Sequence, residues 1–150
     1  MVFVIVSLII SIDQITKFLV TRNLFYNQSV PVIKGVFYLT RIHNRGAAFG
    51  ILRNQVPLFI ITSLLAVTLI YFNLKEHSQK KSYRIALSLI LAGALGNLID
   101  RAFLGYVIDF LDFRVWPVFN VADSAITVGA IVLGWLLLRS EKKAEVKAQG

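Results

Sequence analysis

Acidic residues are few in this chain, and most of them stand where a charge is costly. Only eight are present, and Glu76, Glu141 and Glu145 lie in polar stretches where they need no special role. A charge in the middle of a membrane span costs about 2.5–3.5 kcal/mol, and ionisable residues kept there usually mark functional sites. Five aspartates lie in or beside long apolar stretches, toward one predicted membrane face, and are therefore the first candidates for chemistry: Asp13, Asp100, Asp109, Asp112 and Asp123.

Each of these carboxylates also has a structural interpretation. Asp109 has apolar neighbours and no adjacent cation, so its alternative is a carboxylate that accepts backbone hydrogen bonds in a turn. Asp123 opens the fourth apolar stretch, where an aspartate N-cap is an equally good interpretation. Asn120 stands three residues earlier and can lie on the same side of one helical turn. For Asp112, an ordinary surface pair with Arg114 is the favoured interpretation.

Two further polar pairs have helical spacing. Asn97 and Arg101 are four residues apart and share a helix face. Because an arginine at a helix C-terminus also suits the helix dipole, a structural role for Arg101 is as well supported as a functional one. Asp13 and Lys17 have the same spacing. An ion pair within the helix, with the lysine reaching outward to the membrane interface, is favoured for them.

Other catalytic chemistries are poorly served by this sequence. There is no cysteine, so thiolate catalysis and disulfides are excluded. Neither His43 nor His77 lies in a zinc-binding motif, and there is no G-x-S-x-G nucleophile motif. His43, near the end of a predicted strand, is interpreted as a polar surface residue. We therefore expect no metal and no other cofactor.

Composition assigns these residues to a membrane protein. Apolar residues make up 57% of the chain and charged residues only 16%, against about 25% in soluble proteins. Four apolar stretches can each cross a hydrocarbon core of about 30 Å as a helix, at about 2–20, 57–73, 83–99 and 123–138. Gly93 and Gly96 would allow close helix packing. The net charge of +8 fits Lys and Arg meeting lipid head groups, so no nucleic-acid partner is expected.

The remaining segments must hold the polar candidates in place. Residues 35–43 are rich in β-branched and aromatic side chains and predict one or two strands. The fold class predicted for residues 1–150, taken as a single domain, is a membrane all-α core of four helices with a small extracytoplasmic β-sheet and loops from 21–56 and 101–122. Lys and Arg number eight on each side of this topology, so their count does not orient it. Their density favours 74–82 and 139–150 as cytoplasmic.

Five motifs in order along the chain are similar to those of the lipoprotein signal peptidase (signal peptidase II) family. They are 13–17 (DQITK), 44–49 (NRGAAF), 93–101 (GALGNLIDR), 107–110 (VIDF) and 119–123 (FNVAD). Each is modest alone, but together with four spans in 150 residues they are very specific, and they cover nearly the whole chain except its tail. Ala92, where the family often has a second glycine, and Arg45, at a variable place, are small departures.

The resemblance implies an aspartic endopeptidase of the bacterial plasma membrane, with both termini cytoplasmic. It would remove signal peptides from diacylglyceryl-modified prolipoproteins, cleaving before the lipidated cysteine. Membrane phospholipid would surround it, and we expect a monomer. By motif position Asp109 and Asp123 would be the catalytic pair, sharing one proton because two close carboxylates cannot both ionise easily. The expected substrate-binding or supporting residues are Asn44, Gly46, Asn97, Arg101, Asn120, Ala122, Asp13 and Lys17.

Two other classes of function use the same kinds of residue. A proton-coupled transporter or small channel also places Asp and Arg inside the membrane, although no internal repeat is visible in this sequence. A structural adaptor would need only helix packing. Incubation of the purified protein with a lipidated precursor separates these classes, because only a peptidase releases a signal peptide.

Overall fold

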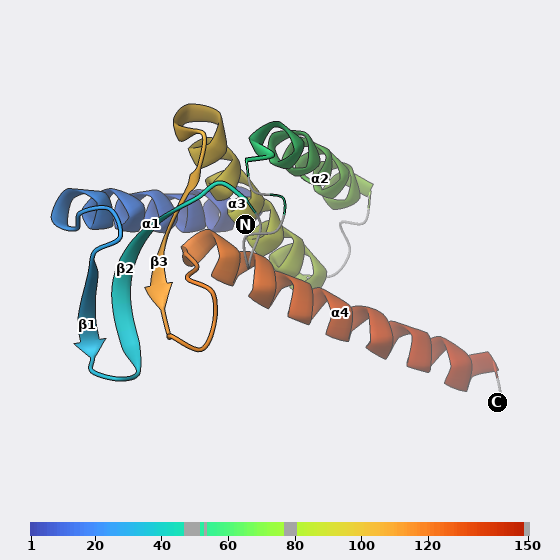
Figure 1. Ribbon diagram of the computed structural model, residues 1–150. Helices are drawn as coiled ribbons and strands as arrows, with labels where there is room; N and C mark the ends of the chain where they lie inside the picture. Colours follow the sequence, from blue (N-terminus) through green and yellow to red (C-terminus); the bar gives the residue numbers. More distant parts are fainter. Residues whose placement is uncertain (47–51, 53, 77–80, 149–150) are drawn as a thin grey trace.

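The computed structural model describes residues 1–46, 52, 54–76 and 81–148 and contains four long helices in these ranges (Figure 1). They are α1 (Val2–Asn23), α2 (Val56–Glu76), α3 (Lys81–Leu104) and α4 (Val121–Ala148). All four are long and apolar enough to cross a membrane, with mean hydropathy of 1.5 to 2.0 over their most apolar windows. Each extends beyond its apolar stretch, because polar residues at the ends continue the helical hydrogen bonding.

Helix α3 is the centre of the bundle, packing against α1, α2 and α4. A side chain at Gly93 would overlap the Ala122 carbonyl oxygen of α4, and one at Gly96 would meet the Asp13 carboxylate of α1. These glycines therefore bring α1 and α4 close to α3, as the sequence predicts. Within Val56–Lys75, the part of α2 whose burial is described, no residue is buried within the protein. This apolar surface suits a lipid environment.

Three strands form an antiparallel sheet beside one end of the helices, in the order β1–β2–β3 (Figure 1). They are β1 (Ser29–Ile33), β2 (Phe37–Asn44) and β3 (Val107–Asp112). The strands predicted in residues 35–43 correspond to β2, whereas β1 lies before that range. Gly35 lies between the two strands with a φ of +83°, which glycine adopts without strain. The predicted fold class of four membrane-crossing helices with a small sheet is confirmed.

Strand β3 joins this sheet to the bundle. It follows α3 after two residues, contacts α1 and α3, and is buried at every position except Leu111. Its register places Asp109 opposite Ile42 and Val107 opposite Asn44 on β2. The end of β2 and the start of β3 therefore lie side by side, next to α3.

Candidate active site

The Asp109 carboxylate is held in β3 by two asparagine side chains. Asn44 of β2 donates to Asp109 Oδ2 at 2.9 Å, and Asn120 donates to Asp109 Oδ1 at 2.7 Å. Asp109 is only 2% exposed. The turn interpretation was therefore wrong. Asp109 lies in a strand, and its carboxylate accepts hydrogen bonds from side-chain amides and not from the backbone of a turn.

The Asp123 carboxylate lies in the first turn of α4, and Asn120, not Asp123, is the residue before this helix. The Asn120 side chain accepts from the Asp123 backbone N–H at 2.9 Å, and Asp123 Oδ2 accepts from the Asn120 backbone N–H at 3.2 Å. This reciprocal arrangement satisfies two N–H groups at the helix start, so the N-cap interpretation belongs to Asn120. Asn97 of α3 donates to Asp123 Oδ1 at 2.7 Å.

Asn120 thus connects the two carboxylates, because its amide donates to Asp109 and accepts from the backbone of Asp123. Both aspartates line one cavity of about 490 Å³. Its walls come from α2, α3, α4, β2, β3 and the segments that follow these two strands. They include Asn44, Gly46, Phe59, Thr62, Ser63, Ala66, Ile90, Ala94, Asn97, Arg101, Trp116, Pro117, Val118, Phe119, Ile126 and Thr127.

The expected site residues divide into two groups. Asn44, Gly46, Asn97 and Arg101 line the cavity with the two aspartates. The Arg101 guanidinium lies 4.9 Å from the centre of the Phe59 ring, with Nη2 3.5 Å from the Gly46 carbonyl oxygen.

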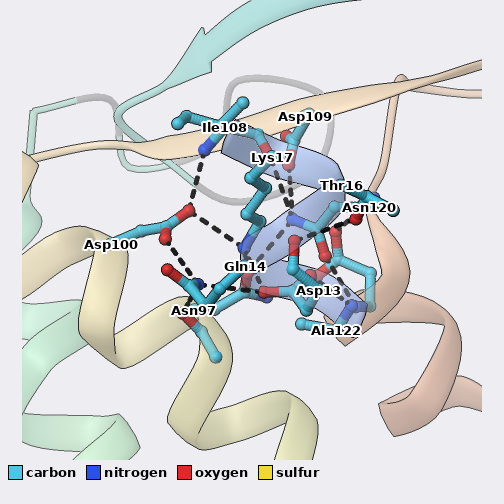
Figure 2. Close-up of polar contacts among 12 residues, drawn as sticks. Asp13, Gln14, Thr16, Lys17, Asn97, Asp100, Ile108, Asp109, Asn120 and Ala122 are labelled. Carbon is cyan, nitrogen blue, oxygen red and sulfur yellow. Dashed lines mark hydrogen bonds and ion pairs between the residues drawn. The ribbon is translucent and has the colours of Figure 1, made fainter. Parts of the chain in front are cut away.

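The second group, Asn120, Ala122, Asp13 and Lys17, lies next to the residues that line the cavity and does not line it. Asn120 and Ala122 are fully buried, and the Ala122 backbone N–H donates to Asp13 Oδ1 at 2.9 Å. Asp13 and Lys17 do not line the cavity. They form an ion pair of 2.7 Å. The outward-reaching lysine was a wrong expectation, because Lys17 is 2% exposed and points into the protein (Figure 2).

Two further residues, Asp100 and Gln14, bind this ion pair and were not among the expected site residues. Asp100 Oδ2 pairs with Lys17 at 2.9 Å and accepts from the Ile108 backbone N–H at 3.0 Å, which ties α3 to β3. Gln14 donates to Asp13 Oδ2 at 3.2 Å and to Asp100 Oδ1 at 3.0 Å. Asp100 had two sequence signals, its place among the five aspartates of apolar stretches and its place in the motif 93–101. Gln14 lies in the motif 13–17, but it was not singled out because an uncharged amide is not distinctive by itself.

Asp112 differs from its expected surface position, whereas His43 is only partly buried. Asp112 does contact Arg114, at 3.5 Å, but it is 5% exposed and accepts from Thr40 at 2.6 Å. The His43 ring stacks on Tyr106 with ring centres 4.0 Å apart. Burial lowers the pKa of His43, and nearby arginines lower it further. Neither residue lines the cavity.

The electrostatics of the cavity separate Asp109 from an ordinary surface carboxyl. Burial raises the pKa of Asp109 to about 7, and the nearby charge of Asp123 acts in the same direction. The hydrogen bonds from Asn44 and Asn120 and the charge of Lys17 oppose this rise. A carboxyl with such a pKa holds a proton near neutral pH and can exchange it, which is what general acid–base catalysis requires. No cluster of three or more His, Cys, Asp or Glu suited to a metal occurs in the described part of the chain.

Comparisons with known proteins agree with this architecture. The family model described as signal peptidase (SPase) II matches residues 5–139. The chain is 48% identical to a lipoprotein signal peptidase of Moorella thermoacetica, over 87% of this chain and 88% of that protein. It is 47% identical to a lipoprotein signal peptidase of Halothermothrix orenii, over 95% and 98%.

Solved structures give the same result. A bacterial membrane enzyme determined by the in meso method at 2.3 Å resolution superposes with a TM-score of 0.91 and 32% identity, covering 95% of this chain and 90% of that one. A second such enzyme, at 1.9 Å resolution, gives a TM-score of 0.85 and 33% identity, over 91% and 92%. The chain therefore belongs to the signal peptidase II family.

Proposed function

We propose that this protein is a membrane-embedded aspartyl endopeptidase that removes signal peptides from prolipoproteins, with Asp109 and Asp123 as its catalytic pair. The family and the relatives named lipoprotein signal peptidase support the reaction. The observation that carries the assignment of the pair is that both carboxylates line one cavity and are connected through Asn120.

The two carboxylates have different tasks in this proposal. Asp109, with its pKa near 7, carries the proton and acts as the acid. Asp123 acts as the base, and the N–H groups of Asn97 and Asn120 that point at its oxygens stabilise its negative charge.

The reaction then follows from ordinary acid–base chemistry. Asp123 takes a proton from a water molecule while the water oxygen attacks the scissile carbonyl carbon, and Asp109 gives its proton to the carbonyl oxygen. A tetrahedral diol forms. In its collapse, a hydroxyl returns a proton to Asp109, and Asp123 gives its proton to the amide nitrogen. The C–N bond breaks, leaving a carboxyl on the signal peptide and an amine on the lipoprotein.

The cavity walls suit a lipid-bearing peptide. Arg101 and the amide of Asn44 supply donors for peptide carbonyl groups, while Ala66, Ile90 and Ile126 supply apolar surface. We infer a substrate that carries a diacylglyceryl group on the cysteine after the cleaved bond. Its acyl chains would remain in the phospholipid around the helices, and the monomer contains the whole proposed site.

The same proposal includes an orientation. Four crossings put both termini on one side, which we assign to the cytoplasm of a bacterium, in its plasma membrane. The sheet and the loop before α4 then lie at the external face, where an exported precursor would meet the carboxylates. The charge density of 74–82 and 139–150 supports this orientation.

The test is a cleavage assay with purified protein in detergent or lipid. A diacylglyceryl-modified precursor should release its signal peptide, and an unmodified precursor should not. Asp109→Asn and Asp123→Asn should each abolish release while the protein still melts cooperatively. Asp112→Asn is the matched control, since this buried carboxylate of the same strand lies outside the cavity and should keep activity. An Asp109 or Asp123 variant that cleaves at the parental rate removes that residue from the mechanism.

A further inference from the structure

The Asn97 side chain can support Asp123 in only one orientation. Its amide has a donor end and an acceptor end, and the bond of 2.7 Å to Asp123 Oδ1 requires the NH₂ end. If the amide turned over, its oxygen would face the carboxylate oxygen, and the bond would become a repulsion. Whatever holds the other end of the Asn97 amide therefore decides whether Asp123 is supported.

That other end is held by Lys17 of α1. Lys17 Nζ donates to Asn97 Oδ1 at 3.1 Å, and Asn120 Nδ2 donates to the same oxygen at 3.1 Å. An ammonium group can only donate hydrogen bonds, so it accepts no other orientation of the amide. Lys17, Asn97 and Asp123 form a directed chain in which each donor faces an acceptor (Figure 2 shows its first contact).

Lys17 is itself held in place. Its Nζ lies 2.7 Å from Asp13 Oδ2 and 2.9 Å from Asp100 Oδ2, and the side chains of all three residues are at most 2% exposed. The backbone N–H of Ala122 binds Asp13, and that of Ile108 binds Asp100. Two fixed carboxylates hold the ammonium in one position.

We propose that Lys17 is a positioning residue of the peptidase, which acts by fixing the orientation of the Asn97 amide that supports Asp123. This inference rests on the proposed function, and it replaces the expected substrate-binding role of Lys17. Lys17 lies outside the cavity and would not contact the substrate. Its effect should therefore appear in kcat and not in KM, and it should require Asn97.

A double-mutant cycle tests this dependence. Lys17→Gln should lower kcat about ten- to a hundredfold with little change in KM, the scale of a lost hydrogen bond to a charged group. Asn97→Ala should lower kcat similarly. In the Asn97→Ala background, Lys17→Gln should have a much smaller effect on kcat, because the amide that it orients is gone and only its charge near Asp109 remains to be lost.

Gln14→Leu is the matched control. Gln14 binds the same two carboxylates from the same helix without touching Asn97. Its loss should lower thermal stability and have the same effect on kcat in both backgrounds. Because Lys17→Gln leaves Asp13 and Asp100 without their cation and can unfold the protein, the cycle is repeated on Asp100→Asn, where only one of these charges remains.

Two results would overturn the inference: a parental kcat for Lys17→Gln, or an equal loss of kcat with and without the Asn97 amide. The second would mean that Lys17 only stabilises the fold. Failure of the proposed function gives a different pattern, in which Asp109→Asn and Asp123→Asn still cleave. If these two variants are inactive and only the cycle fails, the peptidase assignment stands and the positioning role falls.

Discussion

Removal of the Asn44 amide should move the pH dependence of cleavage in a direction that the structure determines. Asn44 donates to Asp109 Oδ2 at 2.9 Å, and this bond lowers the pKa of Asp109 against the effect of burial. If Asp109 is the acid, activity in the parent falls as pH rises through about 7, where the carboxyl loses its proton. Asn44→Ala removes a donor to the ionised form, so the pKa of Asp109 rises.

The size of the shift follows from the bond that is lost. A hydrogen bond to a charged group contributes about 1.5–3 kcal/mol, and one pKa unit corresponds to about 1.36 kcal/mol. The decline in kcat should therefore move upward by about one to two pH units. Asp123, Lys17 and Arg101, from α4, α1 and α3, also act electrostatically on Asp109 and remain in the variant.

The assay is the initial rate of signal-peptide release from a saturating lipidated precursor, measured across pH for parent and variant. Thr40→Val is the matched control. Thr40 lies on the same strand as Asn44 and donates to another buried carboxylate of β3, Asp112, at 2.6 Å. It should lower stability and leave the pH profile unchanged. A profile that stays in place for Asn44→Ala, or moves to lower pH, refutes the assignment of Asp109 as the acid.

Three other expectations follow from the structure. Arg101→Lys keeps the charge but loses the planar guanidinium and its contact with the Phe59 ring of α2. It should therefore lower the cleavage rate about ten- to a hundredfold. A parental rate would mean that the charge alone suffices. Gly93→Ala should lower the melting temperature in detergent or prevent folding, because the added methyl group overlaps α4, whereas Gly134→Ala, in open space on a helix, should be neutral. Because the protein has no cysteine, a single introduced cysteine can report the side of the membrane on which it lies. In intact cells that express the variants, an impermeant thiol reagent should label Val32→Cys and not Ser140→Cys. The reverse pattern would invert the proposed orientation.

Local sequence patterns were sufficient for the outline of the fold. Apolar runs as long as a membrane is thick predict spans because lipid cannot satisfy exposed backbone groups. The polar spacing of Asn97 and Arg101 placed both on one face of α3, and both line the cavity. Five aspartates were selected because carboxylates are expensive in apolar surroundings, and the resemblance to the signal peptidase II motifs singled out Asp109 and Asp123 among them. Apart from the resemblance, these inferences need only one segment of the chain at a time.

Positions of partners could not be predicted in this way. Lys17 was expected to reach outward because Asp13 is the only partner that its local sequence indicates. In the structure it also binds Asn97, which is 80 positions away in the sequence. An N-cap was one of two interpretations of Asp123, but Asn120 takes that place and its side chain accepts a hydrogen bond from the Asp123 backbone N–H. Asp112 was expected at the surface, yet Thr40 binds it from 72 residues away.

The sequence alone determined the four apolar helices, the presence of a small sheet and a set of five candidate aspartates, because hydrophobic length and the cost of charge are local properties. The family motifs then indicated Asp109 and Asp123 within that set. Only the tertiary structure decided which polar groups meet. It placed Asn44 and Asn120 on Asp109, Asn97 on Asp123, and Lys17 behind them. A buried polar group needs a hydrogen-bond partner, and the packing of the whole chain decides which group that is. Here the close contacts of α1 and α4 with α3, which the glycines of α3 allow, bring these partners together.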